Sequence, residues 1–168
     1  MIAAYQRSKL GSALRREQPP PALPELQRRY PAQILLGSCA SFADRIAIYR
    51  LIEHGLSAAD VCKYASAVAL FKNKQILSQL TGLSTRALCR QARDGQCLNC
   101  DRTARVLRFA QTLEKATRVF GSSHDAEDWI STPAMGLDGA TPLQMLINPV
   151  GFELVDDFLT RMEFGVYQ

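Results

Sequence analysis

The sequence has no apolar run that approaches the roughly 18 residues needed for a membrane-spanning helix. It also lacks an N-terminal apolar stretch followed by a small-residue cleavage site, so we expect no secretory signal. Only two histidines are present, and there is no glycine-rich phosphate loop, HExxH motif or Ser/His/Asp cluster. No useful length of sequence alternates apolar and polar residues at the period of a strand. These absences favour a cytoplasmic, all-α protein that is not an enzyme and does not bind membranes.

Cysteine is scarce and its number is odd: the chain contains Cys39, Cys62, Cys89, Cys97 and Cys100. Four of these lie in helix-type sequence, and we interpret them as small buried hydrophobic residues of a reducing compartment. Cys97 and Cys100 form a single CxxC, whereas a zinc site needs four ligands and a thioredoxin-like site needs a βαβ context. We therefore predict no metal and no cofactor, and place these two thiols in a loop between two halves. A thiol-dependent or metal-dependent protein that uses them remains a distant alternative.

Charge is distributed unevenly along the 168 residues. Residues 1–110 contain 17 Lys and Arg against 7 Asp and Glu, whereas residues 111–168 contain 3 against 9. Such an asymmetry favours a polyanionic partner for the first half and a different partner for the second. The alternative is that both halves simply present solvated faces of unlike sign.

Three segments follow from composition and periodicity. Residues 1–40 are expected to form a basic arm, because the prolines between positions 19 and 24 favour extended backbone. Residues 41–100 and 101–168 are expected to form two small helical domains. Side chains that accept bonds from backbone amides mark the expected helix starts. The candidates are Ser41, Ser57 with Asp60 as its capping-box partner, Asp101, Thr141 before Pro142, and Asn148 before Pro149.

The first domain contains a candidate helix-turn-helix, formed by helices over 73–81 and 84–93 with a tight turn at Gly82. The second helix is then able to lie in the major groove of DNA. Arginines at i, i+4 and i+7 line one face of it, where guanidinium groups bind guanine edges or phosphates. Hydroxyls and free amides at its N-terminus also suit a phosphate. The candidate DNA-binding residues are Ser84, Thr85, Arg86, Arg90 and Arg93. The alternative is a solvated basic face of a bundle helix.

The second domain is expected to begin with a long helix over residues 101–120 and to end with an amphipathic helix that stops at Gly165. In the last helix Leu154, Val155, Phe158, Leu159 and Met162 are expected to face inward, and Glu153, Asp156, Asp157 and Glu163 outward. The aromatic ring and polar tip of Tyr167 suit an interface anchor, although the side chain is equally able to fold back onto its own domain.

Several short motifs of the second domain occur in a fixed order: Val119-Phe120-Gly121, Trp129, Pro133, Gly139-x-Thr141-Pro142-Leu143, Gly151 and Gly165-Val166-Tyr167. With these residues the chain resembles, over about residues 41–168, the Xre/MbcA/ParS antitoxins. The resemblance implies an Xre-type helix-turn-helix DNA-binding domain, residues 41–100, joined to a toxin-binding all-α domain, residues 101–168. Cys97 and Cys100 depart from the pattern of that family, and the three arginines are not a motif match.

The same resemblance implies a homodimeric antitoxin that neutralises a RES-domain toxin, an enzyme that consumes NAD. It implies that the last helix and the terminus obstruct the NAD pocket and that the complex binds operator DNA and represses its own operon. The toxin-binding residues carried over are Arg161, Glu163, Phe164, Gly165, Val166, Tyr167 and Gln168. The main rival is a stand-alone transcriptional regulator whose C-terminal domain dimerises.

Overall fold

The structure is a computed structural model and describes residues 32–37 and 42–165. All regular elements among these residues are helices, which confirms the predicted all-α class. Most of the predicted arm, residues 1–40, lies outside the described residues; its described part contains helix α3 (Gln33–Leu36), which packs against α5. In the described part of the chain, no helix is both long enough and apolar enough to cross a bilayer.

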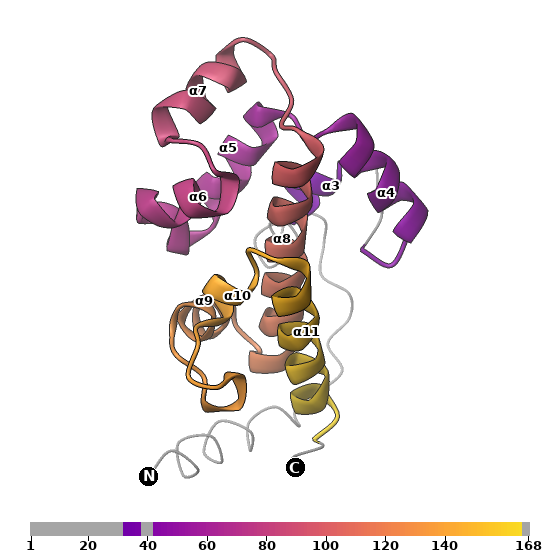
Figure 1. The fold of residues 1–168 in the computed structure, drawn as a ribbon, viewed down its shortest axis with the longest axis vertical. Helices are drawn as coiled ribbons and strands as arrows, with labels where there is room; N and C mark the ends of the chain where they lie inside the picture. Colours follow the sequence, from indigo (N-terminus) through magenta and orange to yellow (C-terminus); the bar gives the residue numbers. More distant parts are fainter. Residues whose placement is uncertain (1–31, 38–41, 166–168) are drawn as a thin grey trace.

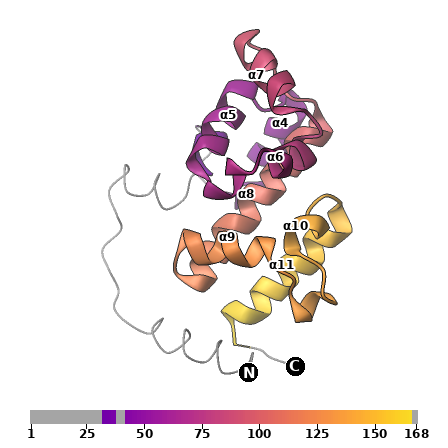
Figure 2. The ribbon, with the colours of Figure 1, turned by 90° about the vertical axis from the view of Figure 1, so that its left-hand side faces the viewer.

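The helices gather in two groups around one long helix, α8 (Cys100–Phe120) (Figures 1 and 2). Around its first turns lie α4 (Arg45–His54), α5 (Ala58–Ala67), the 3-10 helix η1 (Ala69–Lys72), α6 (Lys74–Thr81) and α7 (Thr85–Arg93). Against its later turns lie α9 (Ser123–Ser131), the 3-10 helix η2 (Met135–Leu137), α10 (Pro142–Met145) and α11 (Pro149–Glu163). The helix α8 therefore belongs to the core of both groups.

Two predicted helix starts are wrong by a few residues. Asp44, not Ser41, caps α4, and its carboxylate accepts from the backbone amide of Ala47 at 3.0 Å. Asn99, not Asp101, caps α8, while Asp101 lies in the first turn. Both stretches contain several residues able to cap, and only the backbone path decides which side chain faces the free amides.

The predicted capping box at the start of α5 is also wrong. The Ser57 hydroxyl does cap the helix, but the carboxylate of Asp60 binds the Lys63 ammonium at 2.9 Å instead of reaching back. A capping box forms elsewhere, between Thr141 and Gln144 at the start of α10. The predicted starts at Thr141 and at Asn148, each followed by proline, are confirmed.

The buried residues of α8 include one apolar stripe at helical spacing and extend beyond it. Val106, Leu107, Ala110, Leu113 and Thr117 are buried as the spacing predicts. The helix also buries residues outside that stripe: Thr103, Phe109, Thr112 and Ala116. A helix that packs against elements on several sides must bury more than one face, and an apolar stripe alone does not reveal this.

The interpretation of the cysteines as buried hydrophobic residues is wrong for most of them. Cys89, Cys97 and Cys100 are exposed and Cys62 is half-buried, while Cys39 lies outside the described residues. Cys97 lies in the connection from α7 to α8, where its backbone pairs with Ser57 in an isolated antiparallel bridge. The exposure of these three thiols is therefore set by the fold and not by the apolar character of cysteine.

The last helix, α11, differs from its predicted orientation at two positions. Val155 and Leu159 are fully buried as predicted, but Leu154 is 51% exposed. Asp156, predicted to face solvent, is half-buried because Lys115 of α8 reaches it. The Lys115 ammonium lies 2.7 Å from the Asp156 carboxylate and donates to the Thr160 hydroxyl at 2.6 Å. This lysine therefore fixes the middle of α11 to α8.

We predict that Leu159→Ala lowers the free energy of unfolding by about 2–5 kcal/mol, because it opens a cavity in the core between α11 and α8. The matched control is Leu154→Ala on the same helix, which is half exposed and should lose less than about 1 kcal/mol. Urea unfolding followed by circular dichroism measures both. Equal losses for the two variants would contradict the orientation of α11.

We predict that Lys115→Met lowers the free energy of unfolding by about 1–3 kcal/mol, because it leaves a half-buried carboxylate without its charged donor. The matched control is Lys63→Met, which breaks an ion pair of similar length at the surface and should change stability by about 0.5 kcal/mol or less. If both variants unfold at the same urea concentration, Lys115 does not hold α11 in place.

Candidate functional site

The turn between α6 and α7 is fixed by local bonds. Gly82 adopts the left-handed conformation, with φ of 63°, and its amide donates to the carbonyl of Ser78 at 2.9 Å. The buried hydroxyl of Thr81 donates to the carbonyl of Leu77 at 2.8 Å and accepts from the amide of Leu83 at 3.3 Å. The two helices predicted as a helix-turn-helix therefore form at the predicted positions, whereas their use as a DNA-binding motif stays a prediction.

One face of α7 is apolar and the opposite face carries its arginines. Leu88 is buried and Ala92 packs against the same core. Arg86, Arg90 and Arg93 are all exposed, and α7 lies at the periphery of the molecule (Figure 1). Three guanidinium groups on one exposed helix face are free to approach a phosphate backbone or base edges.

The start of α7 uses the two predicted hydroxyl residues differently. Ser84 is the N-cap, and its hydroxyl oxygen accepts from the amide of Ala87 at 3.2 Å. The hydrogen of that hydroxyl is still able to donate to a bound oxygen. Thr85 is the first residue of α7 and is half-buried.

A row of three aromatic rings fixes the other end of the molecule. Phe120 at the end of α8 and Trp129 of α9 have ring centroids 5.5 Å apart. Trp129 and Phe158 of α11 are stacked, with centroids 6.1 Å apart and planes 2° from parallel. The tryptophan of the sequence motif therefore joins three helices through one continuous contact.

Two glycines allow close packing in the same region. A Cβ atom at Gly151 would lie 2.1 Å from the backbone carbonyl oxygen of Met145. A Cβ atom at Gly136 would lie 2.1 Å from the ring of Phe158. Because glycine has no side chain, α11 packs closely against α10 at Gly151, and η2 packs closely against α11 at Gly136.

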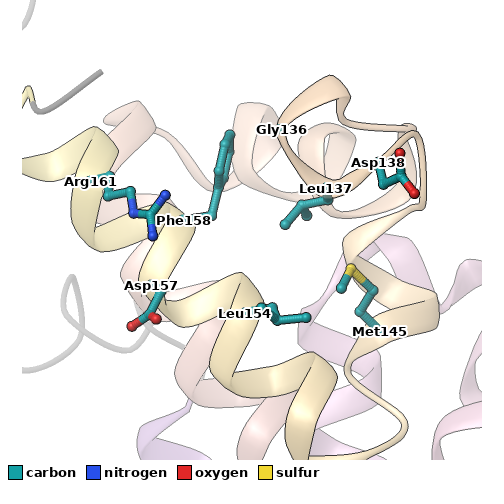
Figure 3. A pocket seen from close by; sticks show the side chains of 8 residues that line it. All are labelled: Gly136, Leu137, Asp138, Met145, Leu154, Asp157, Phe158 and Arg161. Atoms are coloured by element: carbon teal, nitrogen blue, oxygen red, sulfur yellow. The ribbon is translucent and has the colours of Figure 1, made fainter. Parts of the chain in front are cut away.

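A groove of about 270 Å³ opens between α11 and the connection from α9 to α10 (Figure 3). Its lining combines apolar side chains with charged ones: Gly136, Leu137, Asp138, Met145, Leu154, Asp157, Phe158 and Arg161. Asp138 adopts a left-handed conformation, with φ of 55°, which aspartate tolerates better than most residues. An apolar floor with a few charged groups around it is typical of a site that receives a side chain.

Exposed apolar residues continue from the groove onto the surface. Val150 is 66% exposed and lies one turn before Leu154 on α11, and Ile147 precedes them. Met135, at the start of η2, is 82% exposed. Clusters of exposed large apolar side chains mark surfaces that bind another molecule. Sequence reasoning missed this surface, because it assigned Leu154 to the core and gave Met135 no role.

The predicted toxin-binding residues are only partly described. Arg161 lines the groove, and Glu163 and Phe164 are exposed at the end of α11, Phe164 by 73%. Gly165, with φ of 67°, follows the helix as predicted. Residues 166–168 lie outside the described residues. The structure thus brings Arg161 together with the groove, and places Glu163 and Phe164 beyond its end.

The described residues, 32–37 and 42–165, contain no group of three or more His, Cys, Asp and Glu side chains suited to a metal ion. The Cys100 thiol donates to the backbone carbonyl of Glu53 at 3.8 Å. His124 is exposed at the start of α9 and lies 3.4 Å from the carboxylate of Asp128.

Residues 115–165 match the family described as the antitoxin Xre/MbcA/ParS C-terminal toxin-binding domain. The match begins at Lys115, in the second half of α8, and ends just after α11. It therefore includes the aromatic row, both close-packed glycines and every residue of the groove.

Three proteins named Antitoxin Xre are similar to the chain. The protein from Yersinia enterocolitica is 30% identical over 95 residues, which are 56% of this chain and 64% of that protein. The protein from Pseudomonas putida is 34% identical over 70 residues, which are 42% and 44% of the two chains. The protein from Photorhabdus laumondii is 27% identical over 89 residues, which are 52% and 60%. The chain therefore covers less than two thirds of the length of these relatives. Residues 115–165 are thus similar to the toxin-binding domain of the Xre/MbcA/ParS antitoxins, and about half of the chain is similar to proteins named Antitoxin Xre.

Proposed function

We propose that this protein is a cytoplasmic, homodimeric antitoxin that binds and inhibits a RES-domain toxin, an enzyme that degrades NAD. In this proposal α11 and the residues that follow it occlude the toxin's active site. The helix α7 binds operator DNA, so that the protein represses its own operon. In this proposal the chain acts by binding and not by catalysis.

The observation that carries the toxin-binding part is the exposed apolar surface within the segment that matches a toxin-binding domain. The groove, Val150, Leu154 and Phe164 all lie in this segment. An exposed aromatic such as Phe164, beside a groove with an apolar floor, suits the anchor and pocket that dominate binding energy at protein interfaces.

The rigidity of α11 supports occlusion by its end. Lys115 holds the middle of the helix through Asp156 and Thr160, and Phe158 is stacked on Trp129. A binding element that is already ordered loses little conformational entropy when it binds, so more of its contact energy appears as affinity.

The charge of the surface around α11 supports the same proposal, in which the end of α11 enters the toxin's active site. Asp138 and Asp157 lie at the groove, and Glu153 and Glu163 are exposed on α11. Asp156, which the sequence placed in this acidic surface, is instead engaged by Lys115. The remaining carboxylates suit the cationic cleft of an enzyme that binds a dinucleotide phosphate, because complementary charge raises association rates and fixes orientation.

The DNA-binding part rests on α7. Its exposed arginines lie in the half of the chain that has the excess of positive charge. Its buried face packs against α5 and α6. A basic helix face at the edge of a small helical domain is the usual electrostatic footprint of major-groove binding.

We predict that truncation after Gly165 raises the NAD consumption of the toxin at least about tenfold relative to the complex with the full chain, because residues 166–168 would no longer fill the active site. The assay measures NAD loss by the purified RES-domain enzyme with increasing amounts of either form. Binding of both forms to promoter DNA is the control and should be equal.

Two results would count against this proposal. Equal inhibition by the truncated and full-length chains would remove the tail from the mechanism. Failure of the full-length chain to bind any RES-domain enzyme, with DNA binding retained, would favour a stand-alone transcriptional regulator.

We predict that replacing Arg86, Arg90 and Arg93 together with alanine weakens binding to promoter DNA at least about tenfold and reduces its salt dependence, because fewer counterions are released. Titrations at several salt concentrations measure both quantities. Replacing Arg45 and Arg50 of α4 with alanine removes charge from the same half and serves as the control. An unchanged salt slope in the α7 variant would place the DNA elsewhere.

A further inference from the structure

One hydrogen bond between the two helix groups caps the start of η1. The amide of Leu70 donates to the carboxylate of Glu127 in α9 at 2.6 Å, across 57 positions of sequence. Leu70 is the second residue of η1, and the first amides of a helix have no partner within it. The residue before η1 is Val68, whose side chain has no atom able to accept a hydrogen bond. Glu127 therefore supplies the cap that the local sequence lacks.

The position of η1 decides where α6 begins. Asn73 ends η1 and starts α6, and its side chain accepts from the amide of Gln75 at 3.0 Å. Phe71 of η1 is buried and lies against Phe109 of α8, with ring centroids 5.0 Å apart. The ring of Phe71 and the amide of Leu70 thus hold η1 at two points. Because α6 follows η1 directly and ends at the turn to α7, a change at Leu70 reaches the candidate helix-turn-helix.

The other side of α9 faces the groove. Trp129 lies two positions after Glu127, about 200° further around the helix, so the two side chains leave different sides of α9. Trp129 stacks on Phe158, and Phe158 lines the groove (Figure 3). Since α9 is a single helix of 9 residues, a displacement at Trp129 also displaces Glu127.

We propose that Glu127 is a positioning residue that couples the groove to the helix-turn-helix through the amide of Leu70. The bond is made in the arrangement that also forms the groove and exposes the arginine face of α7. A molecule that binds either surface in this arrangement stabilises the bond and so strengthens binding at the other surface. The coupling is therefore positive. Its use between a toxin and DNA rests on the proposed function; the structural coupling does not.

Hydrogen exchange measured by NMR tests the cap in the full-length chain without any partner. Glu127→Ala should speed exchange of the Leu70 amide at least about tenfold and lower the protection of α6, because it removes a charged acceptor. Glu127→Gln keeps an oxygen that accepts from an amide and should restore most of the protection. The matched control is Asp128→Ala, which removes the same charge from the surface of the same helix, beside His124, and should leave Leu70 unchanged.

A second substitution tests whether the groove side of α9 reaches the cap. Phe158→Leu removes the ring that stacks on Trp129 and should speed exchange of the Leu70 amide at least about threefold. In a Glu127→Ala background the same substitution should have no further effect on Leu70, because the connection is already broken. Equal effects in the two backgrounds, or an unchanged Leu70 in Glu127→Ala, would overturn the inference. Urea unfolding of each variant confirms that it is folded.

The proposed function adds a second readout. Saturating RES-domain toxin should raise the affinity of the wild-type chain and of Asp128→Ala for promoter DNA at least about threefold, and DNA should raise the affinity for the toxin by the same factor. In Glu127→Ala this factor should fall toward one. A factor of one in wild type with both partners bound, or an unchanged factor in Glu127→Ala, would overturn the coupling, and the second result would assign it to α8.

The two readouts keep the two proposals apart. Failure of the toxin or of DNA to bind the wild-type chain would reject that part of the proposed function. The exchange rates of Leu70 in the four single and double variants of Glu127 and Phe158 would still decide whether Glu127 couples the groove to α6.

Discussion

The arrangement of this protein depends on α8, one helix that serves the core of two helix groups. Its 21 residues span about 30 Å, and both groups bury side chains against it. Two of its buried threonines have hydroxyl partners: Thr117 donates to the carbonyl of Leu113 at 2.7 Å, and Thr103 accepts from the amide of Leu56 at 3.1 Å. The buried hydroxyl of Thr112 has no hydrogen-bond partner among the described residues. Because α8 is one continuous helix, it fixes the position of the arginine face of α7 relative to the groove beside α11.

A second contact joins the two groups beside α8. The carboxylate of Glu127 in α9 accepts from the amide of Leu70 in η1 at 2.6 Å. Burial raises the pKa of Tyr64 well above its usual range, and the carboxylates of Glu127 and Glu114 raise it further. Burial also raises the pKa of Glu114, which the charge of Arg118 opposes. Acidic groups of the second half therefore lie close to the core of the first. Because Glu127 binds the amide of Leu70, a displacement of α9 would also move η1, which directly precedes α6.

Much of the helical pattern was predictable because its signals are local. Gly82, Gly121 and the proline after Asn148 act within one turn, and the structure ends or begins helices at them. Asp156 and Leu154 were misplaced because their environment is set by Lys115, 41 residues away, and by the connection from α9 to α10. The exposed arginines of α7 could be predicted from helical spacing. The groove could not, because it is formed by segments that are apart in the sequence and whose packing the spacing of residues does not show.

Contacts with residues distant in the sequence also explain why the end of α11 suits binding. Its apolar side is fixed by Leu159 and by the stack of Phe158 on Trp129, so the core holds the helix nearly to its last turn. Beyond that point Phe164 meets solvent, and Gly165 turns the chain with a positive φ. An exposed aromatic on a mobile terminus would lose much of its contact energy to ordering. Here α11 is ordered by its own core contacts, and Phe164 directly follows its last residue.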